Sequence, residues 1–95
     1  MIVIRKKPKH PPEEISIPNT LKALQAEVGG YIESHRVTED MAIICNEEGR
    51  LTSKEPNCRF LGIDWVGTIL LVGIKNGDYT DCPLRQSVME WLHDE

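Results

Sequence analysis

The sequence predicts an α+β domain with a mixed, mainly antiparallel sheet of four to six strands and helices packed on one face of it. Three observations predict this class. A short apolar helix repeat ends on Gly29-Gly30, which suit a left-handed C-cap, and leads directly into strand-type residues. Residues 68–72 are apolar on both faces, as a central strand is. Apolar residues at helical spacing follow Pro83, which indicates a second helix at the C-terminus.

The N-terminal segment predicts two strands joined by a proline-rich connection. Residues 1–4 form an apolar, largely β-branched run typical of a strand. Residues 6–12 contain three prolines, which lack a backbone donor and fix φ, so an exposed loop or hairpin connection is expected there. Residues 14–17 alternate between polar and apolar side chains, which predicts a half-buried second strand that Pro18 ends.

The first helix is expected over residues 20–28, after the second strand, with a side-chain oxygen of Asn19 or Thr20 as its N-cap. Its apolar residues recur at i, i+3 and i+7, which places them on one side of the helix. The predicted buried stripe consists of Leu21, Leu24 and Val28.

Two further strands are expected after Gly30, over residues 31–37 and 41–45, with a polar turn between them. Residues 46–49 have the composition of a tight turn with Gly49 at a position of positive φ. Residues 50–51 would then begin a short strand that runs back.

The last third of the chain is expected to hold a loop, the strongest strand and the second helix. Residues 52–59 are polar and contain a proline, which indicates a loop, whereas residues 65–74 contain the central strand at 68–72. Asn76-Gly77 is a strong turn signal. The helix over residues 83–93 has its predicted apolar stripe at Leu84, Val88, Trp91 and Leu92.

Composition places the chain among ordinary globular domains. Its 95 residues predict a single domain over 1–95, and 40% hydrophobic with 27% charged residues is typical of that class. The apolar stretches are too short to cross a bilayer, and the N-terminal charges follow the apolar residues, unlike in a signal peptide. Three cysteines do not make a complete disulfide set and indicate reduced thiols. A cytoplasmic protein is therefore expected.

No catalytic or metal-binding motif is evident, so neither an enzyme nor a cofactor is expected. The soft ligands His10, His35, His93, Cys58 and Cys82 lack the paired spacing of zinc sites, and Cys45 is expected to be a small core residue. The sequence contains no nucleophile elbow and no glycine-rich phosphate loop. The net charge of −4 argues against direct nucleic-acid binding.

Two features leave a functional and a structural interpretation open. Glu33 and His35 share one face of a strand two residues after Tyr31, which suits either a polar groove or the solvated face of an edge strand. Trp65, next to Asp64, is either an exposed binding anchor or a core residue at the start of a strand.

Several motifs together resemble a family of small domains of unknown function found in bacteriophages, conjugative elements and their bacterial hosts. They are LxxLQxxVGGYIE from Leu21, CNEEGRL from Cys45, the Pro56-Asn57 pair, and Gly67-Thr68 before an apolar strand that ends in glycine. The family usually has an Arg directly after Pro-Asn, where this chain has Cys58 and then Arg59. The resemblance implies a setting, an accessory protein of a mobile element. Because such elements carry small proteins that blunt host defence, that role is expected by analogy.

The expected function is therefore binding. The favoured partner is a host protein, such as a nucleic-acid-binding defence effector, because the acidic residues suit a basic surface. A sponge for a small signalling nucleotide is the alternative, for which residues 5–9 supply the evident positive cluster, and a small hydrolase is the second alternative. The residues expected to form the binding surface are Tyr31, Glu33, Asn46, Glu47, Glu48, Arg50, Asn57, Arg59 and Trp65.

Overall fold

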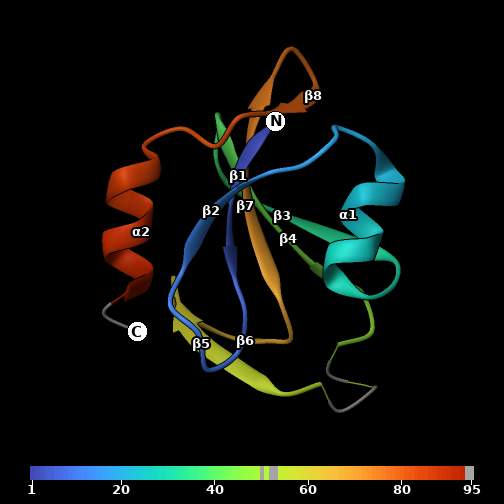
Figure 1. Ribbon diagram of the computed structural model, residues 1–95, viewed down its shortest axis with the longest axis vertical. Coiled ribbons are helices and arrows are strands. Elements are labelled where there is room, and N and C mark those ends of the chain that lie inside the picture. The colour runs from blue at the N-terminus through green and yellow to red at the C-terminus, as the bar shows by residue number, and fades with distance from the viewer. Residues whose placement is uncertain (50, 52–53, 94–95) are drawn as a thin grey trace.

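The computed structural model describes residues 1–49, 51 and 54–93. In the described part of the chain, two strands precede the first helix and six strands separate it from the second, and the two helices flank a central sheet (Figure 1). The elements are β1 (Ile2–Lys6), β2 (Glu13–Ser16), α1 (Leu21–Val28), β3 (Ile32–Thr38), β4 (Met41–Asn46), β5 (Pro56–Phe60), β6 (Ile63–Val66), β7 (Ile69–Lys75), β8 (Asp78–Thr80) and α2 (Arg85–His93).

The predicted α+β class is confirmed. Among the described residues, the main sheet has six strands in the order β2-β1-β7-β4-β3, with β8 paired to β7, and β5 and β6 form a separate two-stranded ribbon. Every pairing recorded between these strands is antiparallel, so the sheet is not mixed. The strand predicted to be central, β7, does lie between β1 and β4 (Figure 1).

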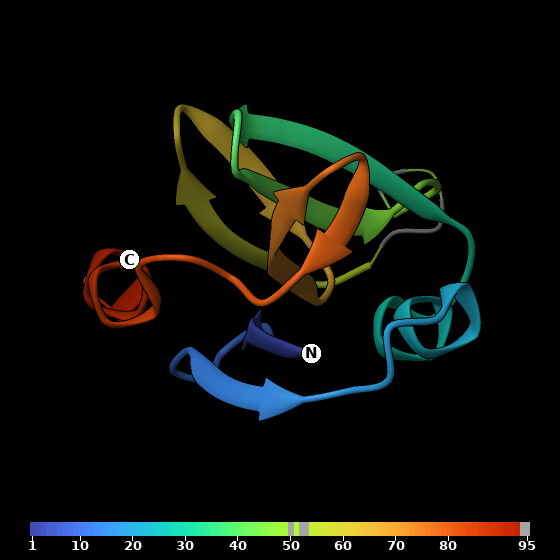
Figure 2. The same cartoon turned by 90° about the horizontal axis from the view of Figure 1, so that it is seen from above.

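The helices cover opposite faces of the sheet, so the prediction that they share one face is wrong (Figure 2). On one face, Leu24 and Val28 of α1 pack with a cluster that includes Leu70 of β7. On the other face, Val88 and Leu92 of α2 join a cluster with the β5–β6 ribbon. The physical reason is that β4 and β7 are apolar on both faces, and both faces therefore need cover.

The first helix begins and ends as its sequence predicts. The Thr20 hydroxyl accepts a hydrogen bond of 3.1 Å from the amide of Ala23, and Gly29 takes the left-handed conformation with φ 78°. The apolar stripe is narrower than predicted, because Leu21 is 58% exposed. Leu24 and Val28 alone are therefore the buried residues of α1.

The C-terminal helix is confirmed, with two corrections to its buried stripe. Leu84 precedes the helix with φ 53° and is exposed, and Trp91 is 49% exposed. Val88 and Leu92 carry the contact with the sheet. Pro83 lies in the turn before α2 rather than in its first turn.

The sequence did not predict the β5–β6 ribbon, nor did it predict the short strand β8. Residues 56–60 form a strand instead of the expected loop, paired with β6 across a turn in which Leu61 and Gly62 both have positive φ. Phe60 and Trp65 anchor the ribbon in the core cluster of the α2 side. Their long-range burial, rather than any local alternation, stabilises these strands.

The turn after β4 is confirmed, but the reason for its glycine differs. The Gly49 amide donates to the carbonyl oxygen of Asn46 at 3.2 Å, and Gly49 does not have a positive φ. A Cβ there would come within 3.1 Å of the Val66 side chain, so the glycine permits close approach of β6. Leu51 lies in a turn and not in the predicted strand, whereas Arg50 lies outside the described residues.

Candidate functional site

A cleft lies between the end of the β3–β4 hairpin, the turn that follows it, and the edge of β6. Its volume is about 340 Å³. The described residues that line it come from these three segments, which are up to 33 positions apart in the sequence. We call it the acidic cleft, and it is lined by Glu33, His35, Cys45, Asn46, Glu47, Gly49, Leu51, Ile63, Asp64, Trp65 and Val66.

The sheet register brings three chemically active side chains together in this cleft. Glu33 on β3 is the direct cross-strand partner of Cys45 on β4, and His35 stands opposite Ile43. Because side chains alternate between the faces of a strand, Glu33, His35 and Cys45 share one face. That face is the one covered by the β5–β6 ribbon, since Cys45 and Ile43 belong to the same core cluster as Trp65.

The polar atoms of these side chains converge. His35 Nε2 lies 2.9 Å from Glu33 Oε2, and the Cys45 thiol donates toward the same oxygen at 3.8 Å. One potential ligand atom from each of the three residues lies within 4.8 Å of the others. Cys45 is only 7% exposed and forms the floor, whereas the Glu33 and His35 side chains are about half exposed at the rim.

Trp65 supports this cluster from β6. Its ring meets the His35 ring edge-on, with 5.2 Å between centroids and an interplanar angle of 85°. The indole Nε1 donates a 3.0 Å hydrogen bond to the carbonyl of Phe60. Trp65 is 5% exposed, so it is a core residue that touches the cleft and not the exposed anchor that the sequence left open.

The cleft carries negative charge. Three of its described lining residues, Glu33, Glu47 and Asp64, are carboxylates, and none of the described lining residues is Lys or Arg. Arg59 offsets part of this charge, because its guanidinium approaches the Asp64 carboxylate at 3.1 Å on the exposed side of the ribbon. The electrostatic character of the cleft therefore favours a cation.

The cleft contains only part of the predicted binding surface. Glu33, Asn46, Glu47 and Trp65 line it, and Arg59 borders it through Asp64. Asn46 also has a structural role, because its amide donates to the Val28 carbonyl at 3.2 Å and its oxygen accepts from the Glu48 amide at 2.7 Å.

The other predicted residues lie elsewhere or are not described. Tyr31, which is 70% exposed, and Glu48 border a shallow neighbouring hollow next to Gly29 and Gly30. Asn57 lies outside the cleft and bonds to the main chain, and Arg50 lies outside the described residues.

The sequence did not identify Cys45 and Asp64 as members of the site. For His35 it left open whether the side chain lines a polar groove or lies on a solvated strand face. A signal for Cys45 was present, because two strands joined by a short turn must pair and bring residues 33 and 45 near each other. A register shift between Arg36 and Thr38 sets which residues face each other. A one-residue slip would have moved Cys45 opposite Ser34 instead, so the pairing could not be read from the sequence.

The cluster resembles a metal-ligand set more closely than a nucleophilic triad. A catalytic thiol needs an adjacent base that is itself oriented by a third group. Here the thiol contacts the carboxylate, and the same carboxylate oxygen holds His35 Nε2. Thiol, imidazole and carboxylate are the ligand types that zinc binds.

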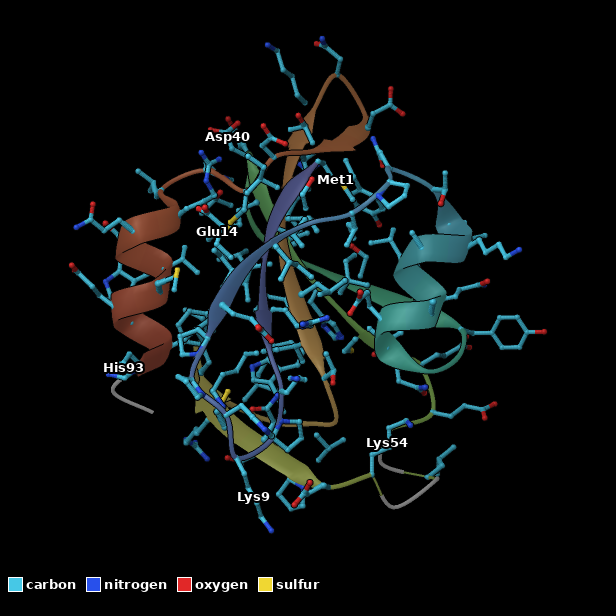
Figure 3. All side chains as sticks on the ribbon, in the orientation of Figure 1. Met1, Lys9, Glu14, Asp40, Lys54 and His93 are labelled. Carbon is cyan, nitrogen blue, oxygen red and sulfur yellow. The ribbon has the colours of Figure 1, made fainter. Side chains whose placement is uncertain are left out.

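A second hollow of about 350 Å³ lies near the other side of the ribbon, and its lining includes two lysines, of which Lys9 is paired with Glu55 at 2.9 Å. Lys6 is 6% exposed, and its ammonium donates to the Lys7 carbonyl and to Asn57 Oδ1, both at 3.0 Å. No described carboxylate forms an ion pair with the Lys6 ammonium. Lys9 and His93, which also line this hollow, lie in the same half of the molecule (Figure 3). We call it the Lys6 pocket, lined by Lys6, Lys9, His10, Pro11, Pro56, Asn57, Leu92 and His93.

Comparison with known proteins assigns the chain to a family without a described function. A family described as "Domain of unknown function (DUF3846)" matches residues 1–94, and the chain belongs to this family. No curated protein and no solved structure matches it. Among the described residues, no helix combines the length and apolar character needed to cross a membrane.

Proposed function

We propose that this family member is a non-enzymatic binding protein that inserts a basic side chain of a protein partner into its acidic cleft. The observation that carries the proposal is the convergence of Glu33, Glu47 and Asp64 around one cavity that has no Lys or Arg among its described lining residues. The sequence resemblance to domains of bacteriophages and conjugative elements adds a setting. In that setting the partner is a host protein in the bacterial cytoplasm, and binding inhibits it.

The geometry suits an Arg or Lys side chain from a protein surface. A cavity of about 340 Å³ accommodates a guanidinium group with its aliphatic stem. The apolar wall, which includes Ile63 and Val66, offers contact to that stem, while the carboxylates at the rim accept its donors. The Glu33 side chain is 50% exposed and the Asp64 side chain 71% exposed, so both carboxylates stay solvated in the free protein.

The decisive measurement is association with the host protein captured by the chain, using purified components. Glu47→Lys reverses an exposed charge at the rim and is expected to slow association and weaken the complex, more strongly at low salt. Glu39→Lys is the matched control, because it makes the same change in the exposed turn at the opposite end of the β3–β4 hairpin. Equal effects of the two reversals would refute the cleft as the binding site.

The sponge for a signalling nucleotide stays as a second candidate because of the Lys6 pocket. A buried ammonium that is bonded to neutral acceptors gains from a nearby anion, since buried charges are costly when uncompensated. Thermal unfolding against a nucleotide panel tests it, with a stabilisation of about 2.7 kcal/mol expected at a hundredfold excess over Kd. Lys9→Glu should abolish that stabilisation, and absence of any shift across the panel would eliminate this candidate.

A further inference from the structure

We infer that Glu33, His35 and Cys45 form a binding site for a thiophilic divalent metal ion of the zinc class. The carboxylate, the imidazole and the thiol supply one ligand atom each, and these atoms lie within 4.8 Å of one another. Around a tetrahedral zinc ion, with ligand bonds of about 2.0–2.3 Å, neighbouring ligand atoms lie about 3.3–3.6 Å apart. Small side-chain rotations therefore suffice to bring the three atoms to an ion.

Hydrogen bonds already assemble the ligands before an ion arrives. Glu33 Oε2 approaches both His35 Nε2, at 2.9 Å, and Cys45 Sγ, at 3.8 Å. An ion at this point replaces the protons that hold the cluster together. Because zinc binds the thiolate, the Cys45 thiol loses its proton on binding, and metal affinity is expected to rise with pH.

The scaffold holds the ligands on rigid elements. Glu33 and Cys45 are a directly paired couple in the β3–β4 ladder, so their backbones are fixed by the sheet. His35 stands two residues from Glu33 on the same face, and the edge of the Trp65 ring restrains its imidazole. Cys45 at the buried floor and the two half-exposed ligands at the rim leave access from the cleft.

Three protein ligands would leave one position of a tetrahedral ion for a further ligand. Water or a donor atom from a bound molecule would complete the coordination. This site does not depend on the proposed basic partner, because it requires only the three side chains. The two proposals separate experimentally, since partner binding is measured on metal-free protein and metal binding without any partner.

The test is titration of the full, metal-free chain with Co²⁺, followed by displacement with Zn²⁺. One Co²⁺ per chain is expected, with a thiolate-to-cobalt charge-transfer band and the visible bands of four-coordinate cobalt. Cys45→Ser should remove the charge-transfer band, and His35→Gln should weaken the Co²⁺ Kd at least tenfold. Cys58→Ser is the matched control, because Cys58 lies on β5 outside the cluster, and it should leave the spectrum unchanged.

Several results would overturn the assignment. They are a titration that does not saturate at millimolar Co²⁺, a charge-transfer band that survives Cys45→Ser, and a band that Cys58→Ser removes. Far-ultraviolet circular dichroism of each metal-free variant shows whether it is folded. Should Cys45→Ser fail to fold, His35→Gln decides the matter, because His35 is partly exposed, and an unchanged Kd there refutes the site.

Discussion

Lys6 and Asn57 bond to each other in both directions across the junction of the main sheet and the β5–β6 ribbon. The Lys6 ammonium donates to Asn57 Oδ1 at 3.0 Å, and Asn57 Nδ2 donates to the Lys6 carbonyl at 2.7 Å. Asn57 Nδ2 also donates to the Gly67 carbonyl at 2.7 Å. The Pro-Asn motif therefore joins β1, β5 and the start of β7, so Asn57 has a structural role in addition to lining the Lys6 pocket.

Asn57→Ala is expected to lower the free energy of unfolding by about 2–4 kcal/mol, because the buried Lys6 ammonium keeps its bond to the Lys7 carbonyl but loses Asn57 Oδ1, and the Lys6 and Gly67 carbonyls lose their side-chain donor. Denaturant unfolding measures the change. Asn19→Ala is the control, since exposed Asn19 makes a single bond to the Tyr79 carbonyl, and it should cost less than about 1 kcal/mol. Equal losses of unfolding free energy in both variants would show that the Lys6–Asn57 pair stabilises the fold no more than an exposed hydrogen bond does.

Trp65→Ala should cost about 3–5 kcal/mol, as expected for truncation of a buried aromatic side chain. The change removes the contact with the His35 ring and the hydrogen bond to Phe60. Trp91→Ala, at a position 49% exposed on α2, should cost less than about 1 kcal/mol. A small loss at Trp65 would instead favour the exposed-anchor interpretation, and thermal or denaturant unfolding distinguishes the two.

The ion pairs of Arg5 predict that the free energy of unfolding decreases when the pH becomes acidic. Arg5 donates to Glu13 at 2.9 Å and to Glu27 at 2.8 Å, which ties β1 to β2 and to α1. The hydrogen bond from Arg5 lowers the pKa of Glu13 below its ordinary value of 4.5. A lowered carboxyl pKa contributes stability that is present above this value and is lost as pH falls through the folded-state pKa.

Arg5→Gln should therefore destabilise the protein by about 1 kcal/mol at neutral pH, because the pairs are partly solvent-screened. The difference from wild type should shrink as the pH falls below about 4.5. Arg36→Gln, at an exposed position of β3, provides the control for loss of a positive charge. A difference between Arg5→Gln and wild type that does not change with pH would contradict this assignment.

Cys82 is expected to be an unreactive thiol. It is fully buried, and this burial raises the pKa of its thiol to about 11. Alkylation of the native protein at pH 8 should therefore modify the part-buried Cys58 first and spare Cys82 until the chain is unfolded. Peptide mass spectrometry over a time course measures both rates, and equal rates in the native state would show that the site around Cys82 opens readily.

The same raised pKa predicts a loss of stability at alkaline pH. Burial favours the protonated thiol, so its contribution is fully present below the ordinary pKa of 9.0 and declines as pH rises toward about 11. Cys82→Ala removes this contribution at every pH. The difference in free energy of unfolding between the two proteins should therefore change over that interval, and a constant difference would contradict the prediction.

Local chemistry along the chain determined several elements correctly. Thr20 and Gly29 cap α1 because a hydroxyl acceptor and a residue tolerant of positive φ are needed there whatever surrounds the helix. Asn76-Gly77 turns between β7 and β8, and the doubly apolar run of β7 lies in the middle of the sheet. These features depend on backbone preferences and hydrophobic periodicity, which are properties of short segments.

Only the tertiary structure decided the faces, the ribbon and the site. Leu21, Leu84 and Trp91 have the spacing of core residues but are exposed in the folded chain. The β5 strand exists because Phe60 and Trp65 reach a core formed by distant strands, and no local pattern encodes that burial. Glu33 faces Cys45 because of the register that follows the shift between Arg36 and Thr38. A slip of the β3–β4 pairing by one residue would have placed Glu33 and Cys45 on opposite faces of the sheet. Local sequence thus specified both helices, the β1–β2 and β3–β4 strands and the central strand, whereas long-range packing and register determined the ribbon and which side chains meet.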